Sequence, residues 1–295
     1  HISLFIKFTS ETHTMKVHTI NTGLFKLDGG AMFGVIPKTL WNKLNPADEN
    51  NMCTWAMRCL LVEHNNRLVL IDNGIGDKQD AKFFSHYYLH GNDSLGKSLR
   101  KLGYTENDIT DVFLTHLHFD HCGGSLRWKA DRSGFELCFP NAVYWSNADH
   151  WKWATQPNAR EKASFLKENI LPIQESGHLK FIENEMLFPG FNIVRVNGHT
   201  DAMMLPVITT GDETIAYCAD LMPSSAHIPI PYVMGYDTRP LLTLDEKSNF
   251  LEKALNENWT LFFEHDPLNE CARLEKTEKG IRVKETFSLQ SLTGY

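Results

Sequence analysis

The sequence predicts a single α+β domain in which strands occur in two runs, each accompanied by helices. This prediction depends on apolar segments of strand length, amphipathic stretches of helical length, and the absence of a linker, repeat or low-complexity tract. The chain has 295 residues, of which 42% are hydrophobic, so it can bury a large core. We assign the domain to residues 15–295 and expect residues 1–14 to be a vector-encoded extension, a cleaved remnant or a native arm.

The first run of strands lies in the N-terminal half of the chain. A helix is expected at residues 94–102, and a second helical tract at 148–167, interrupted near Pro157. Asn65 and Asn66 predict a turn between two strands. Short segments rich in β-branched, aromatic and other apolar residues predict the strands themselves, at residues 15–21, 56–62, 67–72, 109–114 and 142–145.

The second run of strands follows the helical tract at residues 148–167. An amphipathic helix is expected at residues 244–256, because Leu251 and Leu255 fall on one side of it. The same type of apolar segment predicts strands at residues 179–182, 192–196, 203–209, 214–218, 259–263 and 282–287.

The most informative segment of the chain places His116, His118, Asp120 and His121 within six residues. Buried imidazoles must be desolvated and hydrogen-bonded, so such a cluster has no structural advantage. Neutral imidazole nitrogens and carboxylate oxygens are the usual ligands of Zn²⁺ and similar cations. His116 and His118 are two residues apart in an extended segment and point to the same side. Asp120 and His121 lie further round the turn and face elsewhere, which favours two metal positions over one.

This HxHxDH pattern resembles the signature of the metallo-β-lactamase superfamily. The resemblance implies three further ligands, His199, Asp220 and His265, and each of them ends an apolar segment in the family order. It also implies a four-layer αβ/βα sandwich, in which two mixed sheets pack face to face and helices cover both outer faces. The implied centre holds one ion on His116, His118 and His199, another on Asp120, His121 and His265, and a bridge of Asp220 and a water-derived hydroxide.

The expected cofactors are two divalent metal ions, Zn²⁺ in the first place, with Fe, Mn or Co as alternatives. Two such ions, two carboxylates and one hydroxide leave a charge of about +1, which attracts carbonyl or phosphoryl oxygens. Ions roughly 3.5–4 Å apart can generate hydroxide at neutral pH and also polarise the bond that it attacks. Hydrolysis is therefore the expected chemistry.

Within the superfamily, the sequence resembles the N-acyl-homoserine lactone lactonases and the methyl-parathion-type organophosphate hydrolases. The resemblance lies in residues 27–34, 37–41, 219–223 and 226–237, in addition to the metal motifs. It implies that a metal-bridging hydroxide attacks an ester-like bond, in the first place a lactone of the acyl-homoserine type. An organophosphate triester, another carboxylic ester or a thioester is the alternative substrate. A mononuclear iron sulfur-dioxygenase and a metal-binding protein without turnover remain as hypotheses from other classes.

Other branches of the superfamily fit less well. Diiron oxygen- and nitric-oxide-reducing members have Glu at the position of His118 and carry a flavin domain. True dizinc β-lactamases have Cys at the position of Asp220. RNA-processing members need a basic surface or an inserted domain, and glyoxalase II-like thioesterases usually end in a basic part that is not evident here.

The residues that would act on the substrate are less clearly indicated than the ligands. Asp120 is expected to relay a proton to the leaving alkoxide. Some small lactonases have a tyrosine three residues after the bridging aspartate, but Pro223 occupies that position here. The second metal alone would then activate the substrate carbonyl, or His227, Tyr232 or Tyr236 would assist it. An apolar wall beside the metals is expected from Met32, Phe33, Trp41, Phe83, Phe84 and Met234.

The flanking acids allow two interpretations. Glu264 and Asp266 lie on either side of His265, and either could orient its ring as a hydrogen-bond acceptor. A solvated acid on the surface is an equally good interpretation of both residues.

Composition excludes several classes of partner. The net charge is −7 and no basic run exceeds two residues, which argues against nucleic-acid binding. No stretch approaches the ~18 apolar residues that a membrane span requires. The six cysteines form no CxxC pair, which indicates reduced thiols, and we expect a cytoplasmic protein, with an exported form as the open alternative. The expected partner is a small hydrophobic ester-like substrate, and a homodimer remains an open alternative to a monomer.

Overall fold

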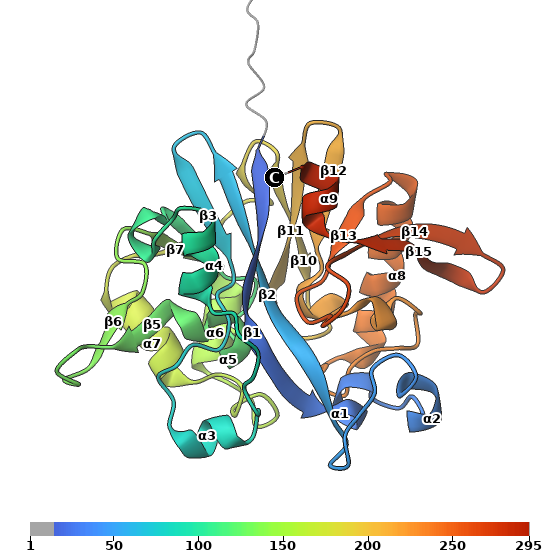
Figure 1. The fold of residues 1–295 in the computed structure, drawn as a ribbon, viewed down its shortest axis with the longest axis horizontal. Coiled ribbons are helices and arrows are strands. Elements are labelled where there is room, and N and C mark those ends of the chain that lie inside the picture. Colours follow the sequence, from blue (N-terminus) through green and yellow to red (C-terminus); the bar gives the residue numbers. More distant parts are fainter. Residues whose placement is uncertain (1–14, 295) are drawn as a thin grey trace, which may run out of the picture.

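The computed structural model describes residues 15–294, so the expectations about residues 1–14 lie outside the described part of the chain. Two mixed sheets pack face to face, and helices lie on both outer faces (Figure 1). The predicted four-layer α+β sandwich is therefore confirmed.

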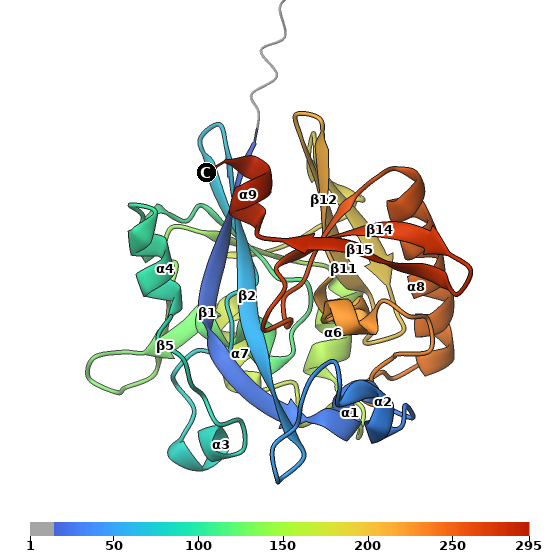
Figure 2. The same ribbon diagram turned by 45° about the vertical axis from the view of Figure 1, so that its right-hand side comes forward.

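The first sheet has six strands in the order β1-β2-β3-β4-β7-β8. Its first three strands pair antiparallel, and the long strands β1 and β2 run side by side (Figure 2). The later strands pair parallel from β3 to β8. The strands are β1 (Lys16–Asp28), β2 (Met52–His64), β3 (Arg67–Ile71), β4 (Asp111–Phe113), β7 (Val143–Ser146) and β8 (Leu179–Phe181).

The second sheet has seven strands in the order β15-β14-β13-β12-β11-β10-β9. All its pairs are antiparallel except β12 with β13, which is parallel. Its strands are β9 (Met186–Phe188), β10 (Phe191–Val196), β11 (Met203–Thr210), β12 (Glu213–Tyr217), β13 (Thr260–Phe262), β14 (Cys271–Thr277) and β15 (Gly280–Phe287). A separate hairpin pairs β5 (Leu126–Trp128) with β6 (Phe135–Leu137).

The helices vary widely in length, and α8 is the longest of those described. It begins with Pro240 at its first position, where a missing N–H costs nothing. None of the helices within residues 15–294 is long and apolar enough to span a bilayer. The α-helices are α1 (Gly29–Phe33), α2 (Lys38–Trp41), α3 (Ala81–Ser85), α4 (Leu95–Lys101), α5 (Phe119–Cys122), α6 (Ala148–Thr155), α7 (Lys167–Glu175), α8 (Pro240–Asn256) and α9 (Leu289–Thr293). Short 3₁₀ turns are η1 (Glu106–Asp108), η2 (Gly123–Ser125), η3 (Ala219–Leu221) and η4 (Ser225–His227).

The alternation of side chains along β2 explains how one sheet can separate two apolar layers. Leu60 and Val62 point into the layer between the sheets, where they join residues of β10 to β13. Cys59 and Leu61 point the opposite way, into the layer beneath α4, α6 and α7. Since successive side chains of a strand face opposite sides, a strand buried on both faces reads as a continuous apolar run.

The predicted helical tract at 148–167 is only partly correct. Helix α6 ends at Thr155, residues 156–166 form an irregular loop, and α7 follows at Lys167–Glu175. The loop is held by the side chain of Asn158, whose Oδ1 accepts from the backbone N–H groups of Arg160 and Glu161. Such side-chain hydrogen bonds compete with the helical pattern.

Candidate metal centre

All seven predicted ligands lie where strands of the two sheets end. His116 and His118 follow β4, and the next turn, α5, carries Asp120 and His121. The remaining ligands come from the other sheet: His199 follows β10, Asp220 lies in η3 after β12, and His265 follows β13. None of the seven predicted ligand residues is more than 8% exposed. The structure thus brings together residues that span about 150 positions of the sequence.

The loop that carries His199 is positioned by α8. Glu246 accepts hydrogen bonds from the backbone N–H groups of Asn197 (2.7 Å) and Gly198 (2.9 Å). Gly198 passes so close to the helix that a Cβ there would lie 2.3 Å from Oγ1 of Thr243. Only glycine allows this approach, so the residue before the ligand is determined by packing.

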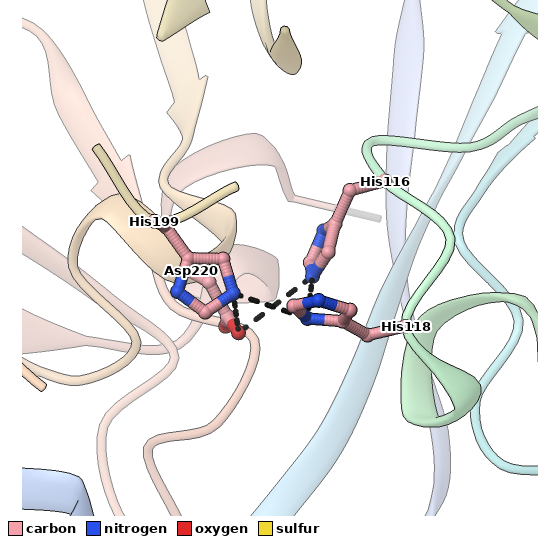
Figure 3. A group of neighbouring side chains, drawn as sticks. All are labelled: His116, His118, His199 and Asp220. Atoms are coloured by element: carbon pink, nitrogen blue, oxygen red, sulfur yellow. Dashed lines mark hydrogen bonds and ion pairs between the residues drawn. The ribbon is translucent and has the colours of Figure 1, made fainter. Parts of the chain in front are cut away.

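The first group consists of His116, His118, His199 and Asp220 (Figure 3). His118 Nδ1 lies 3.1 Å from His116 Nε2 and 3.2 Å from His199 Nε2. Asp220 Oδ2 lies 3.1 Å from His199 Nε2 and 3.7 Å from His116 Nε2. Four potential ligand atoms therefore face one common point.

The second group consists of Asp120, His121 and His265. The two Nε2 atoms of its histidines are 3.2 Å apart, and Asp120 Oδ2 lies 3.8 Å from each. Asp220 reaches this group as well, with Oδ1 3.2 Å from His265 Nε2 and Oδ2 3.5 Å from His121 Nε2. Asp220 Oδ1 is buried and accepts no hydrogen bond from the described residues. One carboxylate thus lies between the two groups, as a bridging ligand would.

The outer nitrogen of each histidine faces a hydrogen-bond acceptor. The outer nitrogen therefore carries the hydrogen, and the inner nitrogen presents a lone pair to the centre. Lone pairs that face one another at 3.1–3.2 Å require a shared cation or added protons, so the donor set fits two divalent ions. The acceptors are Thr115 Oγ1 for His116 (3.1 Å), Glu161 Oε1 for His118 (3.4 Å), Asp72 Oδ2 for His121 (3.1 Å), Asp237 Oδ1 for His199 (2.9 Å) and the Ala56 carbonyl for His265 (2.7 Å).

Burial and charge act differently on the histidines of the first group. Burial lowers the pKa of His116 and His118, so both imidazoles are neutral, as metal binding requires. Burial also acts to lower the pKa of His199, but the carboxylates of Asp220 and Asp237 raise it to about 10. A proton therefore occupies His199 in the absence of a cation, and a metal ion must displace that proton.

The acids beside His265 take other roles than orienting its ring. Glu264 is fully buried and places Oε2 3.1 Å from His121 Nδ1, on the far side of that ring from the centre. Burial raises the pKa of Glu264 to about 7. Asp266 accepts hydrogen bonds from the backbone and hydroxyl of Ser225. Both residues are buried, so the alternative that they are solvated acids is wrong.

A cavity of about 370 Å³ opens over both groups. Five ligands contribute to its lining, together with an apolar side and a polar side. The apolar side is formed by Leu27, Met32, Phe119 and Met234, which belong to one hydrophobic cluster, and Tyr87 packs on Phe119 at 4.8 Å. The polar lining residues are Arg160, Glu161, Ser164 and Tyr236.

The expected apolar wall is therefore partly wrong. Met32 and Met234 do line the cavity. Phe33 and Trp41 are fully buried behind them and stack on each other at 5.3 Å. Phe83 packs edge-on against Phe119 at 5.3 Å, so it supports a residue of the wall without reaching the cavity, and Phe84 in turn packs edge-on against Phe83.

The four candidates for catalysis are placed differently. Asp120 and Tyr236 line the cavity, whereas His227 does not. His227 lies 2.8 Å from Ser224 Oγ and 2.9 Å from the Met32 carbonyl, and its ring stacks on Phe33. Because both its nitrogens are engaged and its ring is buried, the expectation that His227 reaches the substrate is corrected. Tyr232 also stays outside the cavity lining, with its ring edge-on to Phe33.

Several residues of the site were not found from the sequence. Tyr87 and Arg160 line the cavity, and Asp72, Glu161 and Asp237 support ligand histidines. Each is a common polar or aromatic residue without a distinctive spacing, so the sequence carries no signal that separates it from surface residues. Only the folded chain brings these residues to the centre.

Comparisons with known proteins find relatives of the same fold. The family model of the metallo-β-lactamase superfamily matches residues 58–265. An N-acyl homoserine lactonase of Bacillus sp. is 24% identical over 237 residues, which cover 76% of this chain and 85% of the relative. The structure of a probable metal-dependent hydrolase from Staphylococcus aureus superposes with a TM-score of 0.83 at 26% identity, over 93% of this chain and 99% of that one. The dizinc quorum-quenching lactonase AidC, in complex with a product, superposes with a TM-score of 0.73 at 24% identity, over 93% of this chain and 95% of that one.

Proposed function

The chain belongs to the metallo-β-lactamase superfamily and is a hydrolase, and from this premise we propose that it opens lactone rings of the N-acyl-homoserine type. The observation that carries the proposal is the seven-residue His/Asp cluster at the base of a cavity with one apolar side. The similarity to lactonases over most of both chains supports this substrate class.

In this proposal the ligands divide as the two groups do. His116, His118 and His199 hold one divalent ion, Asp120, His121 and His265 hold the other, and Asp220 contacts both. Two ions bound in this way supply a nucleophile from water at neutral pH and polarise the carbonyl that it attacks. The identity of the metal is part of the proposal, with zinc as the first expectation.

The chain's own side chains complete the reaction. Asp120 lines the cavity, and in this proposal its carboxylate passes a proton to the alkoxide oxygen of the opened ring. Tyr236 lines the cavity, and its phenol is protonated at neutral pH, so it can donate a hydrogen bond to the substrate carbonyl. Tyr236 thereby takes the role of the tyrosine that some small lactonases have at the position of Pro223.

The apolar side of the cavity accounts for the acyl chain. Leu27, Met32, Phe119 and Met234 form a surface on which methylene groups can be buried. Each buried methylene contributes about 0.8 kcal/mol, so a chain of several carbons binds more tightly than a bare lactone ring. We therefore expect KM to fall as the acyl chain lengthens, until the cavity is filled.

A substrate panel on metal-loaded protein tests the proposal. N-hexanoyl-homoserine lactone, an aryl ester, a thioester and a paraoxon-like triester are compared on one sample whose metal content is measured by elemental analysis. The lactone should have the highest kcat/KM, and His118→Ala should lose both metal and turnover. Faster turnover of the triester would make the organophosphate alternative correct, and oxygen consumption on persulfides by an iron-loaded sample would indicate a dioxygenase.

A further inference from the structure

Glu161 is a buried acid in the loop between α6 and α7, next to the metal centre. It is 3% exposed and lines the cavity, although its neighbours Arg160 and Lys162 are both exposed. A buried carboxylate is costly unless its oxygens accept several hydrogen bonds. The partners of Glu161 therefore indicate what the residue is for.

Four donors converge on this carboxylate. Oε1 accepts from the Thr200 hydroxyl at 2.5 Å and faces His118 Nε2 at 3.4 Å. Oε2 accepts from Trp153 Nε1 at 2.7 Å and from Asn158 Nδ2 at 2.6 Å. The indole N–H can only donate a hydrogen bond, and Asn158 is fixed in orientation because its Oδ1 accepts two backbone N–H groups.

His118 is the one ligand among these partners. Its Nδ1 faces His116 Nε2 and His199 Nε2, so Nδ1 must present its lone pair to the centre when a cation is bound. The hydrogen of the ring then resides on Nε2, which faces Glu161. Thr200 directly follows another ligand, His199, so the same carboxylate oxygen contacts both ligand-bearing segments.

We propose that Glu161 is a positioning residue that fixes the tautomer and ring orientation of His118 and thereby sets the metal affinity of the His116–His118–His199 group. The inference rests on the metal centre of the proposed function and is independent of which ester is the substrate. Outer partners of this kind typically change metal affinity 10–100-fold when they are removed.

Glutamine at position 161 has nearly the same shape but cannot satisfy this environment. Its amide offers one acceptor oxygen where four donors converge, and its NH₂ group is itself a donor. If the oxygen faces His118 and Thr200, the NH₂ opposes Trp153 and Asn158. If it is reversed, the NH₂ opposes His118 Nε2 and favours the wrong tautomer.

The test is stepwise metal affinity, measured on the full chain by competition of Zn²⁺ with a chromophoric chelator, with the Co²⁺ spectrum as a second readout. Glu161→Gln should weaken one ion about 10–100-fold, leave the other unchanged and alter the Co²⁺ bands. Trp153→Phe is the matched control, because it removes one donor from the same carboxylate on the side away from His118. It should keep both affinities close to those of the wild type.

Two results would overturn the inference. One is wild-type affinity for both ions in Glu161→Gln, and the other is an equal loss in Trp153→Phe, which would indicate a role in loop structure alone. If Glu161→Gln does not fold, Glu161→Asp gives the decision. Its carboxylate is retained but is one methylene too short, so it must weaken the same ion for the inference to stand. Because no substrate enters the measurement, a negative result here does not contradict the lactonase proposal. Failure to hydrolyse lactones would likewise not contradict the role of Glu161 in metal binding.

Discussion

Asp220 Oδ2 faces His199 of the first group and also His121 of the second. Its other oxygen, Oδ1, faces His265, so both groups depend on this one carboxylate. In Asp220→Asn one oxygen is replaced by an NH₂ group, which cannot ligate a cation and repels it. We expect the metal content to fall from two ions to one or none, and kcat/KM to fall by more than the ~100-fold typical of losing an outer partner. Elemental analysis and lactone kinetics on the same sample check this. Retention of two ions would show that Asp220 does not bridge.

His227 is expected to contribute to stability and not to turnover, because both its ring nitrogens are engaged in a buried site. His227→Ala removes a stacked ring and leaves Ser224 and the Met32 carbonyl without a partner. The free energy of unfolding should fall by about 2–4 kcal/mol, as for other large-to-small substitutions in a core. Urea unfolding measures this, and the folded variant at low temperature should keep kcat within a few-fold of the wild type. A loss of kcat of about 100-fold or more without destabilisation would restore His227 as a catalytic residue.

The candidate ligands could be selected from the sequence because metal chemistry restricts ligands to a few residue types at strand ends, and the structure brings these candidates together. The supporting residues could not. Glu161 and Asp237 act through partners 43 and 38 residues away, and the choice of partner depends on how the loops pack. The same limit explains the wrong expectation for His227, whose burial is decided by Phe33 and the Met32 carbonyl.

At the scale of elements, α8 holds the segment that precedes the cavity wall. Lys247 is fully buried, and its Nζ donates to the carbonyls of Pro229 (2.9 Å), Ile230 (3.1 Å) and Tyr232 (2.8 Å). This segment leads into Met234 and Tyr236, which line the cavity. A lysine on a helix thus fixes a loop that has no regular structure of its own.

Lys247→Met should lower the free energy of unfolding by about 3 kcal/mol or more, because three partly buried carbonyls lose their hydrogen-bond donor. Lys253→Met on the same helix is the control, since Lys253 is exposed and pairs with the exposed Glu257. That substitution should change stability by at most about 1 kcal/mol. Thermal and urea unfolding of the two variants give the comparison, and equal effects would contradict the role of Lys247.

Elements with a strong apolar period were predicted well, whereas those that depend on tertiary contacts were not. The apolar runs of β2 and β3 identify both strands, although β2 extends further than predicted, from Met52 to His64. Helix α7 was missed because it contains Pro172, and the loop before it was assigned to a helix because Glu161 reads as a surface residue.

At the scale of the whole molecule, the ligands come from both sheets, so bound cations would connect the two halves of the sandwich. Chelation should therefore lower the melting temperature. Ligand at 1,000 times its Kd stabilises a protein by about 4 kcal/mol, which corresponds to a shift on the order of 10 °C. Scanning fluorimetry before and after chelation, and after return of Zn²⁺, measures the shift. An unchanged melting temperature after proven loss of metal would contradict this coupling.

The placement of the ligands on two sheets also has a consequence for synthesis of the chain. Roughly 140 residues separate His121 from its partner His265. At the usual 5–20 residues per second, the ribosome needs roughly 7–30 s to pass from one to the other. During that interval the growing polypeptide carries an open histidine cluster whose counterpart has yet to be translated. Loading of the centre is thus a late event, and its timing depends on the supply of metal once the C-terminal strands have docked.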